Sequence, residues 1–386
     1  MWLNFLHFYQ PANSSLYRIN EAVEKSYWRL ITILKDNPEL KFTANISACL
    51  LERLKDEGFI DLLTSFIDLI NEGRLEIVGS AAYHGFLPFL PITEVEYQIR
   101  RQEELTQEIL GVDLKGGGFF FPEMAYTPKL AKLVKRLGYT WIIVDEASVN
   151  SDKYEAAVID TNSSLEVIVR SRSFSNAYLP DLVNNDLNNN LPKLIVTATD
   201  SELYGLRHQD PTRELEKMIG LDKLETATIS EFLNQKKSLN KFKLKSASWE
   251  TNHLKDKNSP FIIWNNPKNI IHRDLWRLAA LAIQAGKDFS DDKSYEAYRW
   301  HLDRGLASCM FWWASGVDFS HNFGPVAWNP DEVESILNDL IKSVRSLSSQ
   351  DSLVIKLKAE KLINHIQRDL WRSHWSNHWR SNSEKN

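Results

Sequence analysis

The feature that most constrains this chain is a regular alternation of short apolar runs with longer amphipathic stretches over its first 250 residues. Seven runs have the length and composition of buried strands: Trp2–Phe8, Lys41–Ile46, Leu75–Ser80, Gly118–Phe121, Trp141–Val144, Leu165–Arg170 and Leu194–Ala198. Stretches between them, such as Ile19–Leu34, carry apolar residues at helical spacing. Because strands that alternate with helices form parallel sheets or barrels, we predict an α/β fold. Seven strands favour an incomplete (β/α)7 barrel over an open sheet.

The character of the sequence changes after about residue 258. Asp274–Ala285, Lys293–Trp312 and Asp331–Ser346 have helical periodicity, and no strand pattern separates them. We therefore predict two domains, a barrel over residues 1–258 and a helical region over residues 259–386 that packs on it. The end of the chain after about residue 373 is polar and is expected to fray.

Composition excludes several classes of protein. The 386 residues include 46 Lys and Arg against 51 Asp and Glu, a net charge of −5, which argues against nucleic acid or an anionic membrane as the main partner. Two cysteines are too few for a disulfide framework or a Cys-rich zinc site. No apolar run approaches membrane-spanning length, and the start lacks a signal-peptide pattern. A cytoplasmic protein is predicted, while its oligomeric state stays open.

Two carboxylates follow predicted strands. Glu123 comes after an apolar run and Pro122, and Asp200 ends the last predicted strand, two residues before Glu202. Functional groups of parallel α/β folds gather at the carboxyl ends of strands, so the two could form an acid and nucleophile pair. The structural alternative for Glu123 is a helix-start acid just before the Thr127 cap, and for Asp200 a turn acid.

Other polar and aromatic residues are weaker candidates when taken singly. His7 and Gln10 end the first predicted strand and could bind a sugar hydroxyl, or could simply cap a loop. The chain has 13 Trp, 12 Tyr and 18 Phe, so Trp249 and Trp313 are candidate stacking platforms or core residues. Three arginines are candidates to favour the charged form of Glu123, or are ordinary surface residues: Arg170, Arg172 and Arg207.

Taken in order, these segments resemble glycoside hydrolase family 57. The segments that carry the resemblance are His7-Phe-Tyr-Gln10-Pro11, Gly73-Arg-Leu-Glu76-Ile77 with Tyr83-His84 and Leu87-Pro88, Pro122-Glu123-Met-Ala-Tyr126, and Asp200-Ser-Glu202-Leu-Tyr204-Gly205. The resemblance spans roughly residues 4–320. It implies a seven-stranded β/α barrel followed by a helical region, with the nucleophile after strand four and the acid/base after strand seven. Glu123 and Asp200 stand at those places.

The resemblance also implies an activity and a set of binding residues. The activity is that of a retaining α-amylase or glucanotransferase, which acts on oligo- or polysaccharides of the α-glucan class through a covalent glycosyl-enzyme intermediate. No metal or other cofactor is implied. A segment from Trp313 to Phe319 loosely resembles the family's last motif. The residues implied to bind substrate are His7, Gln10, Glu76, His84, Tyr126, Glu202, Trp249, Trp313 and Asp318.

Two alternatives remain. Tyr9 replaces the second histidine of the family's first motif, so a non-catalytic glycan-binding or regulatory relative of the same barrel stays open. A polysaccharide deacetylase shares a similar barrel, but it would need an Asp-Asp pair and a His-x-x-x-His ligand set within the barrel, and residues 1–258 contain neither.

Overall fold

The computed structural model describes residues 1–149, 155–185, 192–220, 225–252, 259–316 and 327–378. The chain divides into two compact units. We call Met1–Ala82 with Val95–Thr251 the strand unit, and Tyr83–Glu94 with Asn252–Asn386 the helical unit. The short segment Tyr83–Glu94 therefore groups with the C-terminal part of the chain. The predicted domain boundary after residue 258 stays a prediction, because residues 253–258 lie outside the described ranges.

Nine strands are described, all in the strand unit: β1 (Trp2–Phe8), β2 (Phe42–Ile46), β3 (Leu75–Ile77), β4 (Gly118–Phe120), β5 (Trp141–Asp145), β6 (Ala157–Asp160), β7 (Glu166–Arg170), β8 (Ile195–Asp200) and β9 (Lys241–Phe242). One sheet has the order β3-β2-β1-β8 and is entirely parallel. The other has the order β4-β5-β7-β6-β9, in which only β6 and β7 pair antiparallel. The seven predicted strands are all present, whereas β6 and β9 were not predicted.

Hydrogen bonds also join the two sheets to each other. A parallel bridge pairs Gly79, just beyond β3, with Phe119 of β4. In this bridge the Gly79 N–H donates to Gly118 O at 2.9 Å. The other edge strand of the first sheet, β8, meets an inner strand of the second, because the Ser171 N–H, just beyond β7, donates to Val196 O of β8 at 3.0 Å. The parallel α/β class predicted from the sequence is confirmed.

The core explains why the polar residues gather at one end of the strands. Side chains two apart along a strand share a face, and the buried cluster takes Leu3 and Phe5 from β1 and Val196 and Ala198 from β8. The next residues on these faces are His7 and Asp200. At the opposite end, α10 (Ile229–Asn234) adds apolar side chains to the same core. Apolar packing therefore fills the amino-terminal part of the strand array, and polar groups occupy its carboxyl-terminal end.

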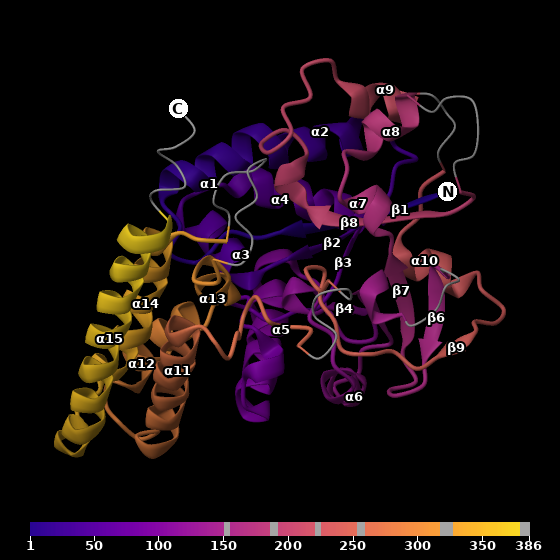
Figure 1. Ribbon diagram of the computed structural model, residues 1–386. Coiled ribbons are helices and arrows are strands. Elements are labelled where there is room, and N and C mark those ends of the chain that lie inside the picture. The colour runs from indigo at the N-terminus through magenta and orange to yellow at the C-terminus, as the bar shows by residue number, and fades with distance from the viewer. Residues whose placement is uncertain (150–154, 186–191, 221–224, 253–258, 317–326, 379–386) are drawn as a thin grey trace. The chain divides into compact units, whose positions relative to one another are not determined.

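The helices of the strand unit are α1 (Leu16–Ala22), α2 (Trp28–Asp36), α3 (Ala48–Asp56), α4 (Ile60–Asn71), α5 (Ile92–Leu110, whose first residues belong to the helical unit), α6 (Pro128–Arg136), α7 (Arg172–Ser175), α8 (Leu179–Asn185), α9 (Glu214–Gly220) and α10. Figure 1 shows α2 and α4 side by side. Gly58 has φ +81°, a left-handed conformation that ends α3 before α4 begins.

The helical unit contains α11 (Ile270–Asp288), α12 (Tyr295–Gly305), α13 (Ser308–Trp313), α14 (Pro330–Ser346) and α15 (Leu353–Ser373), which confirms a helical C-terminal region (Figure 1). The predicted helix Lys293–Trp312 is divided into α12 and α13, because Ala307 between them is extended and pairs with Gly85. A side chain at Gly305 would lie 2.6 Å from Leu340 Cα, so only glycine permits this close approach of α12 to α14. After α15 the chain continues as a π-helical turn, His374–His378.

Candidate active site

The carboxyl ends of β1 and β8 place His7 beside Asp200, since the two residues are Cα partners in the parallel register. The His7 ring is buried, and its Nδ1 lies 2.9 Å from Asn45 Oδ1. Burial lowers the pKa of His7 from 6.5 to about 4, although the negative charge of Asp200 opposes this shift. A neutral imidazole therefore stands next to the carboxylate near neutral pH.

Asp200 is the more accessible of the acidic groups here, with a quarter of its side chain exposed. Its Oδ2 forms an ion pair with Arg207 Nη1 at 2.7 Å, and the Arg207 side chain is mostly solvent-exposed. The charge of Asp200 is the main reason that the pKa of Arg207 is raised. Arg207, one of the three arginines considered for Glu123, is thus paired with the other carboxylate.

Glu202 lies behind Asp200 and is almost fully buried. Its Oε1 accepts hydrogen bonds from Gln10 Nε2 at 2.9 Å and from the Tyr27 hydroxyl at 2.6 Å. Burial is the main cause that raises the pKa of Glu202. Gln10 and Glu202 were both predicted to bind substrate; the structure brings the two groups into contact with each other, and their binding of substrate stays a prediction. Their contacts suit them to supporting the loop that follows β8.

Glu123 occupies a strained turn directly after β4. Its φ is +61°, and that of Met124 is +50°, so two consecutive non-glycine residues have left-handed backbones. The Trp249 indole Nε1–H donates to Glu123 Oε2 at 2.9 Å, and the Trp249 backbone N–H donates to Glu123 O at 3.3 Å. The side chain is largely buried, at 8% exposure. Strain of this kind concentrates at functional sites, where surrounding contacts maintain it.

Trp249 and His7 connect the two carboxylates. Their ring centroids lie 6.2 Å apart, with Phe120 of β4 within 4.7 Å of the His7 ring. Glu123 bonds to one of these rings, and Asp200 stands beside the other in the strand register. The structure therefore brings together four of the predicted residues, Glu123, Asp200, His7 and Trp249, at the carboxyl ends of β1, β4 and β8.

Glu76 and Tyr126 make contacts elsewhere. Glu76 Oε2 accepts from the Thr43 hydroxyl at 2.8 Å and from Ser230 N, and Oε1 accepts from the Ser230 hydroxyl. These bonds tie β2 and β3 to the first turn of α10. The Tyr126 hydroxyl donates to Asp160 Oδ2 at 2.9 Å. Both residues lie in the predicted motifs, and their polar atoms contact other parts of the strand unit; their binding of substrate stays a prediction.

The remaining predicted residues belong to the helical unit. The His84 Nδ1 lies 2.8 Å from Ser308 Oγ, and the His84 carbonyl accepts from Ser308 N, so this histidine fastens its segment to the start of α13. Trp313 ends α13 and is partly exposed. Asp318 lies outside the described residues. The predicted substrate contacts of these three residues, and the predicted absence of a metal, stay predictions.

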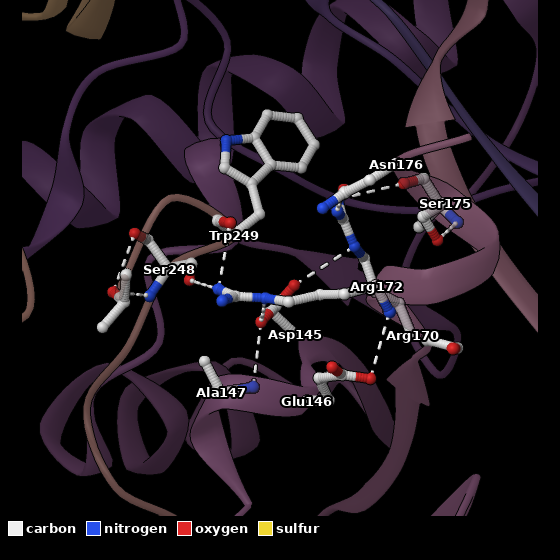
Figure 2. A network of polar contacts seen from close by, with 12 residues as sticks. Asp145, Glu146, Ala147, Arg170, Arg172, Ser175, Asn176, Ser248 and Trp249 are labelled. Atoms are coloured by element: carbon white, nitrogen blue, oxygen red, sulfur yellow. Dashed lines mark hydrogen bonds and ion pairs between the residues drawn. The ribbon is translucent and has the colours of Figure 1, made fainter. Parts of the chain in front are cut away.

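Asp145, at the end of β5, was not predicted. It is fully buried and forms ion pairs with Arg170 Nε at 3.1 Å and Arg172 Nε at 2.6 Å (Figure 2). Arg170 and Arg172 are therefore paired with Asp145, and their predicted influence on the charge of Glu123 stays a prediction. The signal for Asp145 was available, since the apolar run Trp141–Val144 leads into an acid just as the strand before Asp200 does.

The fold and the site together define a class of protein, parallel α/β proteins with acidic groups after separate strands. The sequence profile of Glycosyl hydrolase family 57 matches residues 4–241. The chain belongs to this family. In the described residues no helix is long and apolar enough to cross a membrane.

The chain is 33% identical to an alpha-amylase of Pyrococcus furiosus over 149 residues, which are 37% of this chain and 22% of the amylase. The match thus spans less than a quarter of that relative. Among solved structures, 4-alpha-glucanotransferase from Thermococcus litoralis superposes with a TM-score of 0.68 at 21% identity, over 90% of this chain and 59% of that one. A branching enzyme of family 57 from Pyrococcus horikoshii gives a TM-score of 0.65 at 17% identity, over 94% of each chain. Similarity at these identities establishes the fold.

Proposed function

We propose that this chain is a retaining glycoside hydrolase or glucanotransferase that acts on α-glucans. The observation that carries the proposal is the convergence of Glu123 and Asp200 on the His7 and Trp249 rings at the carboxyl ends of parallel strands. Family membership and the relatives named as amylase and glucanotransferase support the substrate class. The proposal includes a barrel of seven parallel strands, supported by the hydrogen bonds that join β3 to β4 and β7 to β8, and a cytoplasmic location, supported by the low cysteine count.

In the proposed reaction, Glu123 acts as the nucleophile. Its ionised carboxylate attacks the anomeric carbon while protonated Asp200 gives its proton to the departing glycosidic oxygen, which leaves a covalent glycosyl-enzyme ester. Asp200, now a base, takes a proton from water or from an acceptor sugar hydroxyl, whose oxygen then displaces Glu123. The hydrogen bond from the Trp249 indole favours the charged form of Glu123, because it is donated to a carboxylate oxygen.

The aromatic rings supply the contacts for a sugar. Trp249 is partly exposed, and Tyr9 stacks on His7 with ring centroids 5.6 Å apart. The apolar faces of a pyranose ring pack well on such surfaces. His7 is a hydrogen-bonding group for a sugar hydroxyl in its neutral form. His84, Trp313 and Asp318 are also proposed to bind substrate, as the resemblance to the family implies.

The test is product analysis with purified protein and maltoheptaose, run beside Glu123→Gln and Asp200→Asn. Shorter oligosaccharides that both variants fail to form support hydrolysis, and longer ones support transfer. Thermal unfolding of each variant serves as the control for folding. A wild-type protein that leaves maltoheptaose unchanged removes the α-1,4-glucan assignment, and binding of maltoheptaose without turnover favours the non-catalytic relative.

A further inference from the structure

Trp249 is held in place by a buried charged cluster that has no direct contact with Glu123 among the described interactions. Arg172 donates from Nη2 to the carbonyl oxygens of Ser248 at 3.2 Å and Trp249 at 3.0 Å (Figure 2). The same guanidinium donates from Nε to Asp145 Oδ1. One side chain therefore connects the end of β5 to the backbone of the residue that bonds Glu123.

Arg170 approaches Trp249 from a second direction. Its guanidinium carbon lies 5.6 Å from the centroid of the indole ring, within the range of a cation–π contact. It also donates to Ala198 O at 3.1 Å, two residues before Asp200, and to Asn176 Oδ1 at 2.6 Å. Arg170 thus links the indole to the strand that carries the second carboxylate.

Asp145 is the anion that holds both arginines. Its Oδ1 also accepts the Ala147 backbone N–H at 2.9 Å, and its side chain is completely buried. Burial raises the pKa of Asp145, and the two guanidinium groups oppose that rise. Two guanidinium groups share this one buried carboxylate, and Glu146 Oε2 accepts the Arg172 backbone N–H at 3.0 Å, so each partner is restricted to one arrangement. β5 and β7 are already joined by their parallel pairing, so these ion pairs are not required to hold the two strands together.

We propose that Asp145, Arg170 and Arg172 form a positioning network that fixes Trp249 and, through its indole N–H, the carboxylate of Glu123. The inference rests on the proposed function, in which Glu123 is the nucleophile. The three residues act through Trp249 and are positioning residues. Their contribution is to hold the attacking oxygen in one orientation, since small displacements of a reacting group lower the rate strongly.

The first measurement does not depend on turnover. In protein labelled with 15N-tryptophan, the indole resonance of Trp249 is identified by its loss in Trp249→Phe. We expect it to move in Glu123→Gln, which alters its acceptor, and to move or broaden in Arg172→Lys, which cannot reach two carbonyls and Asp145 at once. Arg299→Lys is the matched control, because Arg299 is a buried arginine bonded to Glu94 and Asp303 within the helical unit. It should leave the resonance in place.

The second measurement is steady-state kinetics with maltoheptaose. Arg172→Lys should lower kcat by about 10²-fold while KM changes less than about threefold, since the nucleophile is misplaced and most of the binding surface remains. Asp145→Asn should act in the same direction. If Asp145→Asn fails to fold, Arg172→Lys alone decides the question.

The outcomes separate the two proposals. A Trp249 resonance that is unchanged in Arg172→Lys overturns the network, whether or not the protein acts on glucans. A displaced resonance with normal kcat overturns its catalytic role. A wild-type protein without activity on maltoheptaose counts against the proposed function, and the displaced resonance in Arg172→Lys with an unchanged one in Arg299→Lys still supports the positioning of Trp249.

Discussion

Glu76 and Glu123 are two largely buried glutamates of the strand unit, and they differ in what surrounds them. Glu76 sits in a regular strand and accepts hydrogen bonds from Thr43 and Ser230, next to the first turn of α10. Glu123 lies in a left-handed turn after its strand and accepts a hydrogen bond from the side chain of Trp249. Trp249 in turn contacts two charged residues, one from β7 and one from α7. One carboxylate completes the packing of its neighbours. The other is kept in a strained position by its neighbours, which is the arrangement expected of a reacting group.

The sharpest test of this contrast is Glu123→Gln. The change removes the nucleophile but keeps the volume of the side chain, so kcat on maltoheptaose should fall by at least about 10³-fold. The free energy of unfolding, measured in urea, should change by less than about 1 kcal/mol, because the amide oxygen can still accept the Trp249 N–H. A variant that retains more than a tenth of the wild-type rate would remove Glu123 from the nucleophile's role.

Asp200→Asn extends the contrast to the second carboxylate. An amide cannot give up a proton to the leaving oxygen, so kcat should fall by about 10²–10⁴-fold with a natural oligosaccharide. The loss should be much smaller with an activated aryl glycoside, whose leaving group needs no proton in the first step. Equal losses with both substrates would contradict the acid role and assign Asp200 to another step.

The third prediction concerns the dependence of the free energy of unfolding on pH, to which His7 contributes. Because the folded-state pKa of His7 is about 4 against 6.5 in the unfolded chain, the unfolded state binds the proton first as pH falls. The neutral His7 therefore contributes about 3 kcal/mol to the free energy of unfolding. This contribution is fully present above pH 6.5 and is lost as the pH falls toward 4. His272 in the helical unit, with a pKa also near 4, acts in the same window.

Urea unfolding of the wild type and of His7→Gln at several pH values between 7 and 4 measures this effect. The variant should show a shallower fall in unfolding free energy, with the remainder due to His272. Glu76 and Glu202, whose pKa values burial raises, contribute with the opposite sign. Parallel curves for the two proteins would mean that folding does not lower the pKa of His7.

The smallest expected effect on kcat is that of replacing Glu76. Glu76→Ala removes the acceptor of the Ser230 groups and should lower the unfolding free energy by about 1–3 kcal/mol. The folded variant should keep kcat within about threefold of the wild type, since no polar contact of Glu76 reaches Glu123 or Asp200 among the described residues. A large loss of kcat with normal stability would support the predicted binding of substrate by Glu76.

Sequence alone determined the elements and the class of fold. The seven parallel strands follow from apolar runs of strand length, and the positions of Glu123 and Asp200 after β4 and β8 follow from counting those runs. Thr228 and Glu231, three residues apart, form a capping box at the start of α10. These features are local, because a strand, a cap or a strand-end acid depends on the residues within a few positions of it.

Tertiary structure alone decided the roles within the site. Gln10 and Glu202 lie 192 residues apart in the sequence, and Trp249 lies 126 residues from the carboxylate that it bonds. Asp145 ends β5, and its two arginine partners come from the end of β7 and the start of α7. A side chain's partner across the fold depends on strand register and on the packing of distant segments, and neither has a local pattern. The residue types marked the carboxyl ends of the strands, and the packing determined which of these side chains contact one another there.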